Sequence, residues 1–133
     1  MKRLFSSLIA LLLVFTIGLT GCSSPTPSGL TGNYGEDTVA VIESLRTALS
    51  LPDNTPEQAE AQTAARQTIN DFAGLYRREP SLQDRASFTT MITALNALAG
   101  HYGAYANRPV PQKLKDRLEQ EFKQVEMALR RGA

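Results

Sequence analysis

The chain has 133 residues, of which 42% are hydrophobic and 20% are charged, and its formal net charge at pH 7 is +1. Lys2 and Arg3 lie in an N-terminal segment that we expect to be removed, and without them the basic residues fall one short of the 13 acidic ones. This balance argues against nucleic acid as a partner, because binding to phosphates requires a strongly basic surface.

The N-terminus has the pattern of a secretory signal peptide. Lys2 and Arg3 precede an apolar run over residues 4–20 that ends in small side chains. The run is too short for a comfortable transmembrane helix, which needs about 20 predominantly apolar residues. We therefore predict that residues 1–21 are a signal peptide and are removed.

The chain's single cysteine, Cys22, follows this run directly. The sequence Leu19-Thr20-Gly21-Cys22 resembles the lipobox of bacterial lipoproteins, in which the thiol receives a diacylglyceryl group and the new amine is usually acylated. The alternative is an ordinary signal peptide followed by an incidental free thiol. We expect lipidation at Cys22, because two or three acyl chains hold a protein on a bilayer almost permanently.

The segment after the cysteine is predicted to be a flexible tether. Residues 23–35 are mostly Ser, Pro, Gly and Thr, and such a composition buries too little apolar surface to offset chain entropy. Residues 22–35 are therefore expected to be the lipidated N-terminus and tether. Residues 36–133 remain for one domain of ordinary size.

Four amphipathic segments fill this domain. The first spans residues 36–50, and the second spans 56–78 with Thr55 as N-cap, Pro56 at the first helical position and Gln58 completing a capping box. The apolar stripe of the second segment includes Leu75.

The third segment spans residues 84–105 and the fourth spans 112–131, after the sequence Pro109-Val110-Pro111. Ala99 falls within the stripe of the third segment. Four such helices with short connections predict an all-α, up-down-up-down four-helix bundle.

A bundle of this kind can carry haem or a metal, and this is the alternative function that the residues leave open. A haem site would use His101 with Met91 or Met127, but His101 lies about 240° round its helix from Leu95 and so off the apolar stripe. Met91 and Met127 have the spacing of core residues. A di-iron or di-manganese centre needs two Glu-x-x-His pairs, and the chain has one histidine.

The acidic residues, Asp37 among them, are better explained as a solvated surface than as metal ligands. No nucleophile elbow or P-loop is present in the sequence. We therefore expect no enzyme, no catalytic or metal residues and no cofactor.

Small side chains form a band on the third helix, beside its large apolar stripe. The preferred interpretation is close packing inside the bundle, and the alternative is a docking face for an external partner. The band consists of Ala86, Thr90, Thr93, Ala94, Ala97, Gly100 and Ala104.

Basic side chains gather where the fourth helix begins. At this position the helix macrodipole disfavours each cation by about a few tenths of a kcal/mol. The basic residues are Arg108, Lys113, Lys115 and Arg117. Together with Asn107, which shapes the connecting loop, they are candidate contacts to an acidic protein partner, the alternative being an ordinary solvated charge run. A second group, Arg77, Arg78 and Arg85, should lie at the opposite end of the bundle, where anionic lipid head groups are candidate partners.

Short sequence matches extend over nearly the whole mature chain. They comprise Leu30-Thr31-Gly32-Asn33-Tyr34, Asp37-Thr38, Leu45-Arg46-Thr47-Ala48, Ala65-Arg66-Gln67, Ile69-Asn70-Asp71, Tyr76-Arg77-Arg78, Ser87-Phe88-Thr89-Thr90-Met91, Thr93-Ala94-Leu95-Asn96, Leu98-Ala99-Gly100, Asn107-Arg108-Pro109, Pro111 and Lys113-Leu114-Lys115. This set resembles the photosystem II assembly lipoproteins of cyanobacteria, the Psb27 family.

The resemblance implies a monomeric four-helix bundle anchored by lipid on the lumenal side of the thylakoid membrane. It implies binding to immature or damaged photosystem II through the lumenal domain of a chlorophyll-binding antenna subunit. The role would lie in assembly and repair, keeping the site of the oxygen-evolving manganese cluster accessible, without catalysis or a cofactor. The competing hypothesis is a periplasmic helical-bundle lipoprotein that carries a metal or haem.

Overall fold

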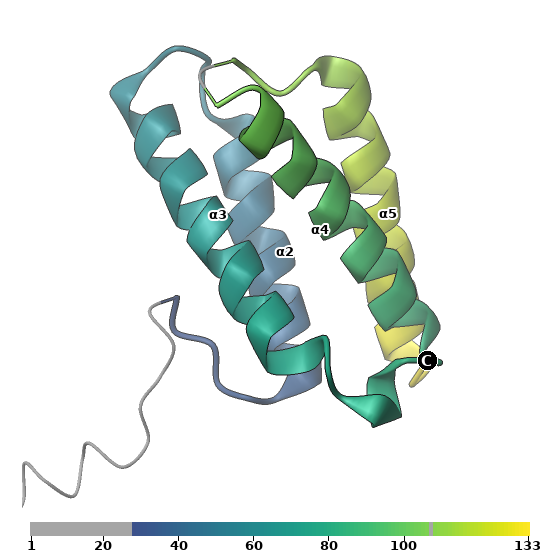
Figure 1. Ribbon diagram of the computed structural model, residues 1–133. Helices are drawn as coiled ribbons and strands as arrows, with labels where there is room; N and C mark the ends of the chain where they lie inside the picture. Colours follow the sequence, from purple (N-terminus) through teal and green to yellow (C-terminus); the bar gives the residue numbers. More distant parts are fainter. Residues whose placement is uncertain (1–27, 107) are drawn as a thin grey trace, which may run out of the picture.

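The computed structural model describes residues 28–106 and 108–133. Within them the chain forms four α-helices and one short 3-10 helix (Figure 1). Their bounds are α2 (Tyr34–Ser50), α3 (Pro56–Tyr76), η1 (Pro80–Leu82), α4 (Ala86–Ala104) and α5 (Gln112–Arg130).

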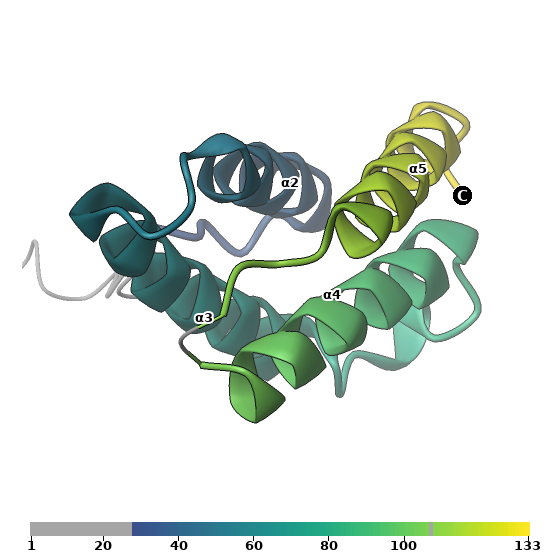
Figure 2. The same cartoon turned by 90° about the horizontal axis from the view of Figure 1, so that it is seen from above.

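The four α-helices run alternately up and down. In Figures 1 and 2, α2 lies beside α3, α4 beside α5, and α3 beside α4, and contacts between α2 and α5 complete the arrangement. The prediction of an all-α, up-down-up-down four-helix bundle is therefore confirmed. None of the helices in the described parts of the chain is long and apolar enough to cross a membrane.

The core consists of the apolar stripes that periodicity predicts. Phe72 and Phe122 are its largest fully buried side chains, and Met91 is fully buried as predicted. Burying each such side chain stabilises the fold by about 1.5 to 3 kcal/mol. The other side chains with less than 2% exposure include Val41, Ile42, Leu45, Leu98, Leu118 and Val125.

Three residues that were predicted to face the core do not. Leu75 is 40% exposed, Met127 is 48% exposed, and Ala99 is exposed as well. Each of the three lies next in sequence to a buried residue, respectively Tyr76, Ala128 and Leu98, and is thus rotated about 100° from it. The apolar stripe is narrower than the sequence pattern indicates.

The helix starts largely match the predicted signals. Thr55 accepts a hydrogen bond from the Gln58 amide at 3.2 Å, which confirms it as the N-cap of α3. The Gln58 side chain, however, accepts from the Asn54 amide at 3.1 Å rather than from Thr55. Asn54 has a φ of 61°, and this left-handed conformation turns its amide toward the helix.

The third predicted helix is shorter than expected because the chain turns twice before it begins. Residues 80–82 form η1, and Arg85 is extended at the N-cap position without a side-chain cap bond. The amide of Ser87 instead donates to the carbonyl of Ala133 at 3.1 Å. The end of α5 thus satisfies a helix-start donor that a capping side chain would otherwise take.

The prediction that residues 23–35 form a flexible tether is wrong at the C-terminal end of this segment. Leu30 is 6% exposed and belongs to the core cluster, and the hydroxyl of Ser28 donates to Asp71 at 2.6 Å. We call residues 28–33 the docked segment. The Ser- and Gly-rich composition concealed it because backbone donors, rather than apolar side chains, make most of its contacts. The predicted signal peptide and residues 22–27, which include Cys22, lie outside the described residues.

The docked segment is held by Asp37, whose side chain was predicted to be solvated but is 1% exposed. Its carboxylate accepts from the amide and hydroxyl of Thr31 at 2.7 and 2.8 Å, from the amide of Gly32 at 2.9 Å, and from the hydroxyl of Tyr76. A buried carboxylate is tolerated when donors surround it in this way. The prediction failed because a position in the first turn of a helix suggests an exposed acid.

Arg46 joins α2 to α5. Its guanidinium makes two-pronged contacts with Glu119, at 2.8 and 3.0 Å, and further bonds with Glu126. These hydrogen bonds raise the pKa of Arg46, with Glu119 making the larger contribution. Ion pairs as well as packing therefore hold α2 against α5, which make few contacts with each other.

The band of small side chains on α4 does not lie inside the bundle. Ala94 is fully buried, but Ala86, Thr93, Gly100 and Ala104 are exposed. A Cβ placed on Gly100 or Gly103 would meet no atom within 4 Å. The preferred interpretation of close internal packing is therefore wrong for most of the band.

Candidate docking surface

The loop after α2 and the connector after α4 meet at one end of the bundle, the upper end in Figure 1. The side-chain amide of Gln62 on α3 donates to the carbonyl of Ala106 at 2.9 Å, which ties the connector to the neighbouring helix. The predicted contacts Arg108, Lys113, Lys115 and Arg117 all lie here, and we call these four residues the basic end. Asn107 lies outside the described residues.

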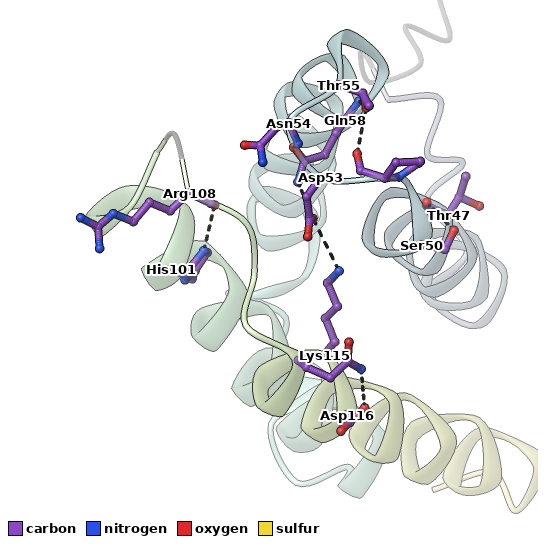
Figure 3. Close-up of polar contacts among 12 residues, drawn as sticks. Thr47, Ser50, Asp53, Asn54, Thr55, Gln58, His101, Arg108, Lys115 and Asp116 are labelled. Atoms are coloured by element: carbon purple, nitrogen blue, oxygen red, sulfur yellow. Dashed lines mark hydrogen bonds and ion pairs between the residues drawn. The ribbon is translucent and has the colours of Figure 1, made fainter.

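Arg108 is the outermost member of the basic end. Its side chain is exposed and points away from the helices in Figure 3, while its carbonyl lies 3.4 Å from Nε2 of His101. Its guanidinium carbon stands 5.8 Å from the ring centre of Tyr105. This stacking positions the cation without neutralising it.

Lys115 has a different environment. Its ammonium pairs with Asp53 in the loop after α2, at 3.8 Å, and only 20% of its side chain is exposed (Figure 3). This contact joins the start of α5 to the α2–α3 loop. In the free protein, Lys115 therefore helps to hold the α2–α3 loop against the start of α5.

Arg117 and Lys113 complete the basic end. Arg117 bonds to Glu121 one turn along α5 at 3.1 Å, but 54% of its side chain stays exposed. Lys113 is exposed and forms no ion pair with the described part of the chain. Arg108 and Lys113 are thus the cations at this end that are most available to a partner.

The local structure at the start of α5 explains why these charges stay accessible. Pro111 occupies the N-cap position, no side chain caps the helix, and no acidic residue lies in the first turn. A helix start of this kind normally carries acids, which the macrodipole favours. Helix stability does not account for lysine and arginine here.

Two features of this surface were not identified from the sequence. Tyr105 is 51% exposed, and an open depression of about 410 Å³ lies between the start of α3 and the connector, lined in part by Thr55, Gln62 and Arg108. An exposed aromatic next to a cation is typical of residues that anchor protein interfaces. The sequence did not indicate that Tyr105 is exposed, because it lies three residues after the buried Tyr102, a spacing that places two side chains on the same face of a helix.

The described residues contain no group of three or more His, Cys, Asp or Glu side chains placed to hold a metal. His101 is half-buried and packs edge-on against Tyr102, with 6.2 Å between ring centres, as its position off the apolar stripe predicted. Met91 lies in the core and Met127 is exposed on another helix. The three candidate haem ligands are therefore not brought together by the bundle core.

Known proteins similar to this chain match it over almost its full length. A chain 57% identical over 133 residues, covering all of this chain and 98% of the relative, is the photosystem II assembly factor lipoprotein Psb27 of Thermosynechococcus vestitus. The photosystem II lipoprotein Psb27 of Synechocystis is 52% identical over 99% of this chain and 97% of its own. The chloroplastic photosystem II repair protein PSB27-H1 of Arabidopsis thaliana is 34% identical over 99% of this chain and 77% of its own.

Solved structures agree with the fold. The solution structure of Psb27 from cyanobacterial photosystem II superposes with a TM-score of 0.76 at 50% identity, covering 85% of this chain and 96% of that one. The crystal structure of PSB27 from Arabidopsis thaliana gives 0.72 at 39% identity, covering 75% and 98%. The family model described as Photosystem II Pbs27 matches residues 6–129. This chain belongs to the Psb27 family.

Proposed function

We propose that this protein is a non-catalytic assembly and repair factor for photosystem II. The observation that carries the proposal is its 57% identity, over its full length, to a relative named as an assembly factor of that complex. The relative from Arabidopsis thaliana is named as a repair protein. The exposed cations of the basic end support a role in docking, because paired acidic and basic patches speed and orient protein association.

The partner surface in this proposal is the lumenal domain of a chlorophyll-binding antenna subunit in immature photosystem II. Arg108 and Lys113 make direct contacts to acidic side chains, Arg117 adds a charge at the rim, and Tyr105 supplies apolar area. Lys115 contributes chiefly by holding the α2–α3 loop beside them, as its ion pair with Asp53 indicates. Asn107 shapes the connector from which Arg108 projects.

The location in this proposal is the lumenal side of the thylakoid membrane, with Cys22 carrying the lipid. The Leu-Thr-Gly-Cys sequence and the word lipoprotein in the names of two relatives support an anchor. Bound there, the protein occupies the photosystem while the manganese cluster forms and then leaves. Confinement to the membrane raises its effective concentration, so weak contacts suffice for occupancy.

The competing function is a carrier of metal or haem. The relatives of this chain are named for photosystem II and not for transport, and its described residues contain no ligand set. A Soret band or stoichiometric metal in the purified protein would support the carrier instead.

Affinity capture from thylakoid membranes tests the proposal. The full-length protein is expressed in its host with a C-terminal affinity tag, the membranes are solubilised in mild detergent, and the captured proteins are identified by mass spectrometry. Photosystem II core subunits in sub-complexes that lack the extrinsic proteins are the expected result. Recovery of the tagged protein without core subunits would overturn the proposal.

A further inference from the structure

The end of the bundle opposite the basic end carries five arginines. Arg77 and Arg78 follow α3, Arg85 precedes α4, and Arg130 and Arg131 finish α5. All five are exposed, and we call them the arginine end. The lower end of the bundle in Figure 1 is where these segments meet.

These arginines keep their charge available. None of the five pairs with an acidic side chain in the ranges that the structure describes. Arg77 donates to the side chain of Asn96 at 3.2 Å, and the guanidinium of Arg85 stands 5.8 Å from the ring centre of Tyr34. Asn96 lies ten residues into α4, so the Arg77 cation is directed along the side of the bundle, whereas the contact of Arg85 with Tyr34 holds that cation at the end. Neither cation is neutralised.

The acidic side chains at this end are fewer. The exposed ones are Glu36, Glu79 and Asp84, and Asp37 lies buried behind the docked segment. Glu79 is turned toward Ser81, whose hydroxyl lies 3.4 Å from its carboxylate. An approaching anionic surface therefore meets more cations than anions here.

The chain enters the described structure beside the same end. The amide and hydroxyl of Ser28 donate to Asp71 on α3, at 3.2 and 2.6 Å. Asp71 lies six residues before Arg77, which is about 9 Å along a helix axis at 1.5 Å per residue. The opposite end of α3, at Pro56, lies about 22 Å from Asp71 on the same measure.

The length of chain before Ser28 limits how the bundle can be placed. Between the proposed lipid attachment at Cys22 and Ser28 lie about six peptide units, which span at most about 22 Å. With the basic end on the bilayer, Ser28 would stand about 22 Å above it, and the whole linker would have to be fully extended. The arginine end lies well within this reach.

We propose that the arginine end lies on anionic phospholipid head groups of the membrane that carries the lipid anchor. The inference rests on the anchor of the proposed function and adds a second, electrostatic contact that fixes orientation. Arginine suits this role because its guanidinium pairs with phosphate in a two-pronged geometry. Single lipid anchors strengthened by basic patches follow the same logic.

The orientation has a consequence for docking. Helices of 19 to 21 residues are about 30 Å long. With the arginine end on the bilayer, Arg108 and Lys113 project by about that distance into the aqueous phase. The basic end then faces the part of a membrane complex that rises above the bilayer, and not its membrane-embedded part.

The experiment measures which end lies nearer the membrane. The lipidated protein is reconstituted on vesicles of phosphatidylcholine, with or without phosphatidylglycerol, that contain an energy-acceptor lipid. A donor dye is attached to Ser81→Cys at the arginine end or to Glu57→Cys near the basic end. Lipidation leaves the introduced thiol as the one reactive cysteine.

On phosphatidylglycerol vesicles, energy transfer should be stronger from the position 81 dye than from the position 57 dye. The difference should fall to its value on neutral vesicles in 1 M salt, where the Debye length is about 3 Å. The double reversal Arg78→Glu with Arg131→Glu should likewise lower it to the neutral-vesicle value, and the matched reversal Arg108→Glu with Lys113→Glu should not. Circular dichroism establishes that each variant is folded.

Three outcomes overturn the inference. Equal energy transfer from positions 81 and 57 rejects the contact between the arginine end and anionic lipid, and so does a difference that does not change with lipid charge or salt. Both results leave the anchor and photosystem binding intact. Loss of the difference in the Arg108 and Lys113 variant places the contact at the wrong end. Failure of the protein to float with vesicles refutes the anchor itself, a result that affinity capture of photosystem subunits then separates from the docking function.

Discussion

The hydroxyl of Tyr76 donates to the buried carboxylate of Asp37, at an O···O distance of 2.5 Å. This bond connects the C-terminal end of α3 to the start of α2, and the same carboxylate holds the docked segment. Burial raises the pKa of Asp37, but hydrogen bonds from Thr31, Tyr76 and Gly32 outweigh it and hold the pKa below 3.8. One carboxylate therefore organises three parts of the chain without a cation.

Replacing Tyr76 with Phe should lower the free energy of unfolding by about 1.5 to 3 kcal/mol, because a hydrogen bond to a charged, buried group is lost. Tyr34→Phe is the matched control in the same aromatic cluster, since it removes a neutral bond to Ser87 at 2.8 Å and should cost about 0.5 to 1.5 kcal/mol. Urea titrations give both values. Equal losses would show that the charge of Asp37 adds nothing.

Stability should stay nearly constant from mild acid to mild alkali and fall outside that range. Asp37 has a lowered pKa, so its contribution is present above about pH 3.9, the unfolded value, and is lost as the pH falls through the folded pKa. Burial raises the pKa of Tyr102 to about 12, so its contribution is lost as the pH rises from about 10, the unfolded value, through 12. Urea midpoints measured against pH should show both limits.

The two limits can be assigned by substitution. Asp37→Asn should remove part of the acid-side loss, because the bond from Ser28 also lowers the pKa of Asp71. Tyr102→Phe should flatten part of the alkaline loss, with Tyr105→Phe, an exposed tyrosine, as control. An alkaline slope that is the same in the Tyr102 and Tyr105 variants would contradict the assignment to Tyr102.

Replacing Arg46 with Met should lower the free energy of unfolding by about 0.4 to 2 kcal/mol, since exposed ion pairs contribute about 0.2 to 1 kcal/mol each and this arginine makes two. Methionine keeps apolar contact near Phe122, whose ring centre is 6.0 Å from the guanidinium carbon. Arg117→Met, which breaks a pair within one helix, should cost less than about 0.5 kcal/mol. The Arg46 effect should shrink in 1 M salt, and an effect unchanged by salt would assign it to packing.

Reversing charge at Arg108 and Lys113 should weaken capture of the photosystem core about tenfold, or about 1.4 kcal/mol, without unfolding the bundle. Arg66→Glu with Lys123→Glu reverses two exposed cations on the sides of the bundle and serves as the control. Titration of solubilised sub-complexes with each variant measures the change. If the control weakens binding as much, net charge and not the basic end is responsible.

Changing Cys22 to Ser should release the protein from the membrane. The wild-type chain should enter the detergent phase on phase partition and show the added mass of the lipid, because two or more acyl chains bind a bilayer almost permanently. The serine variant should stay in the aqueous phase. Partition of the two proteins into the same phase would contradict lipidation at this residue.

Periodicity predicted most of the fold because each helix buries one stripe. The capping signal at Thr55 and Pro56 gave the start of α3 to the residue, since that signal is local in sequence. The start of α4 was missed because η1 and the Ser87–Ala133 bond depend on contacts between distant segments. Met127 was misplaced because a one-residue rotation decides whether a side chain at the edge of a stripe is buried.

The candidate surface was predictable in charge but not in detail. An excess of cations at a helix start is visible in sequence, because the macrodipole argues against it. Which of them stay available is not visible: Lys115 pairs with Asp53, which lies 62 positions earlier, and sequence spacing cannot reveal that contact. Asp37 shows the same limit, since its donors come from the docked segment and from Tyr76.

The docked segment also constrains the order of events during synthesis. Thr31 and Gly32 bond to the nearby Asp37, but the bond partner of Ser28, Asp71, is made 43 residues later, so this part of the docking waits until α3 has emerged. In the export that we propose, which proceeds from the N-terminus, Ser28 is therefore still unbound to α3 when the residues before it first reach the processing enzymes. The modification that we propose at Cys22 would thus precede the attachment of Ser28 to α3.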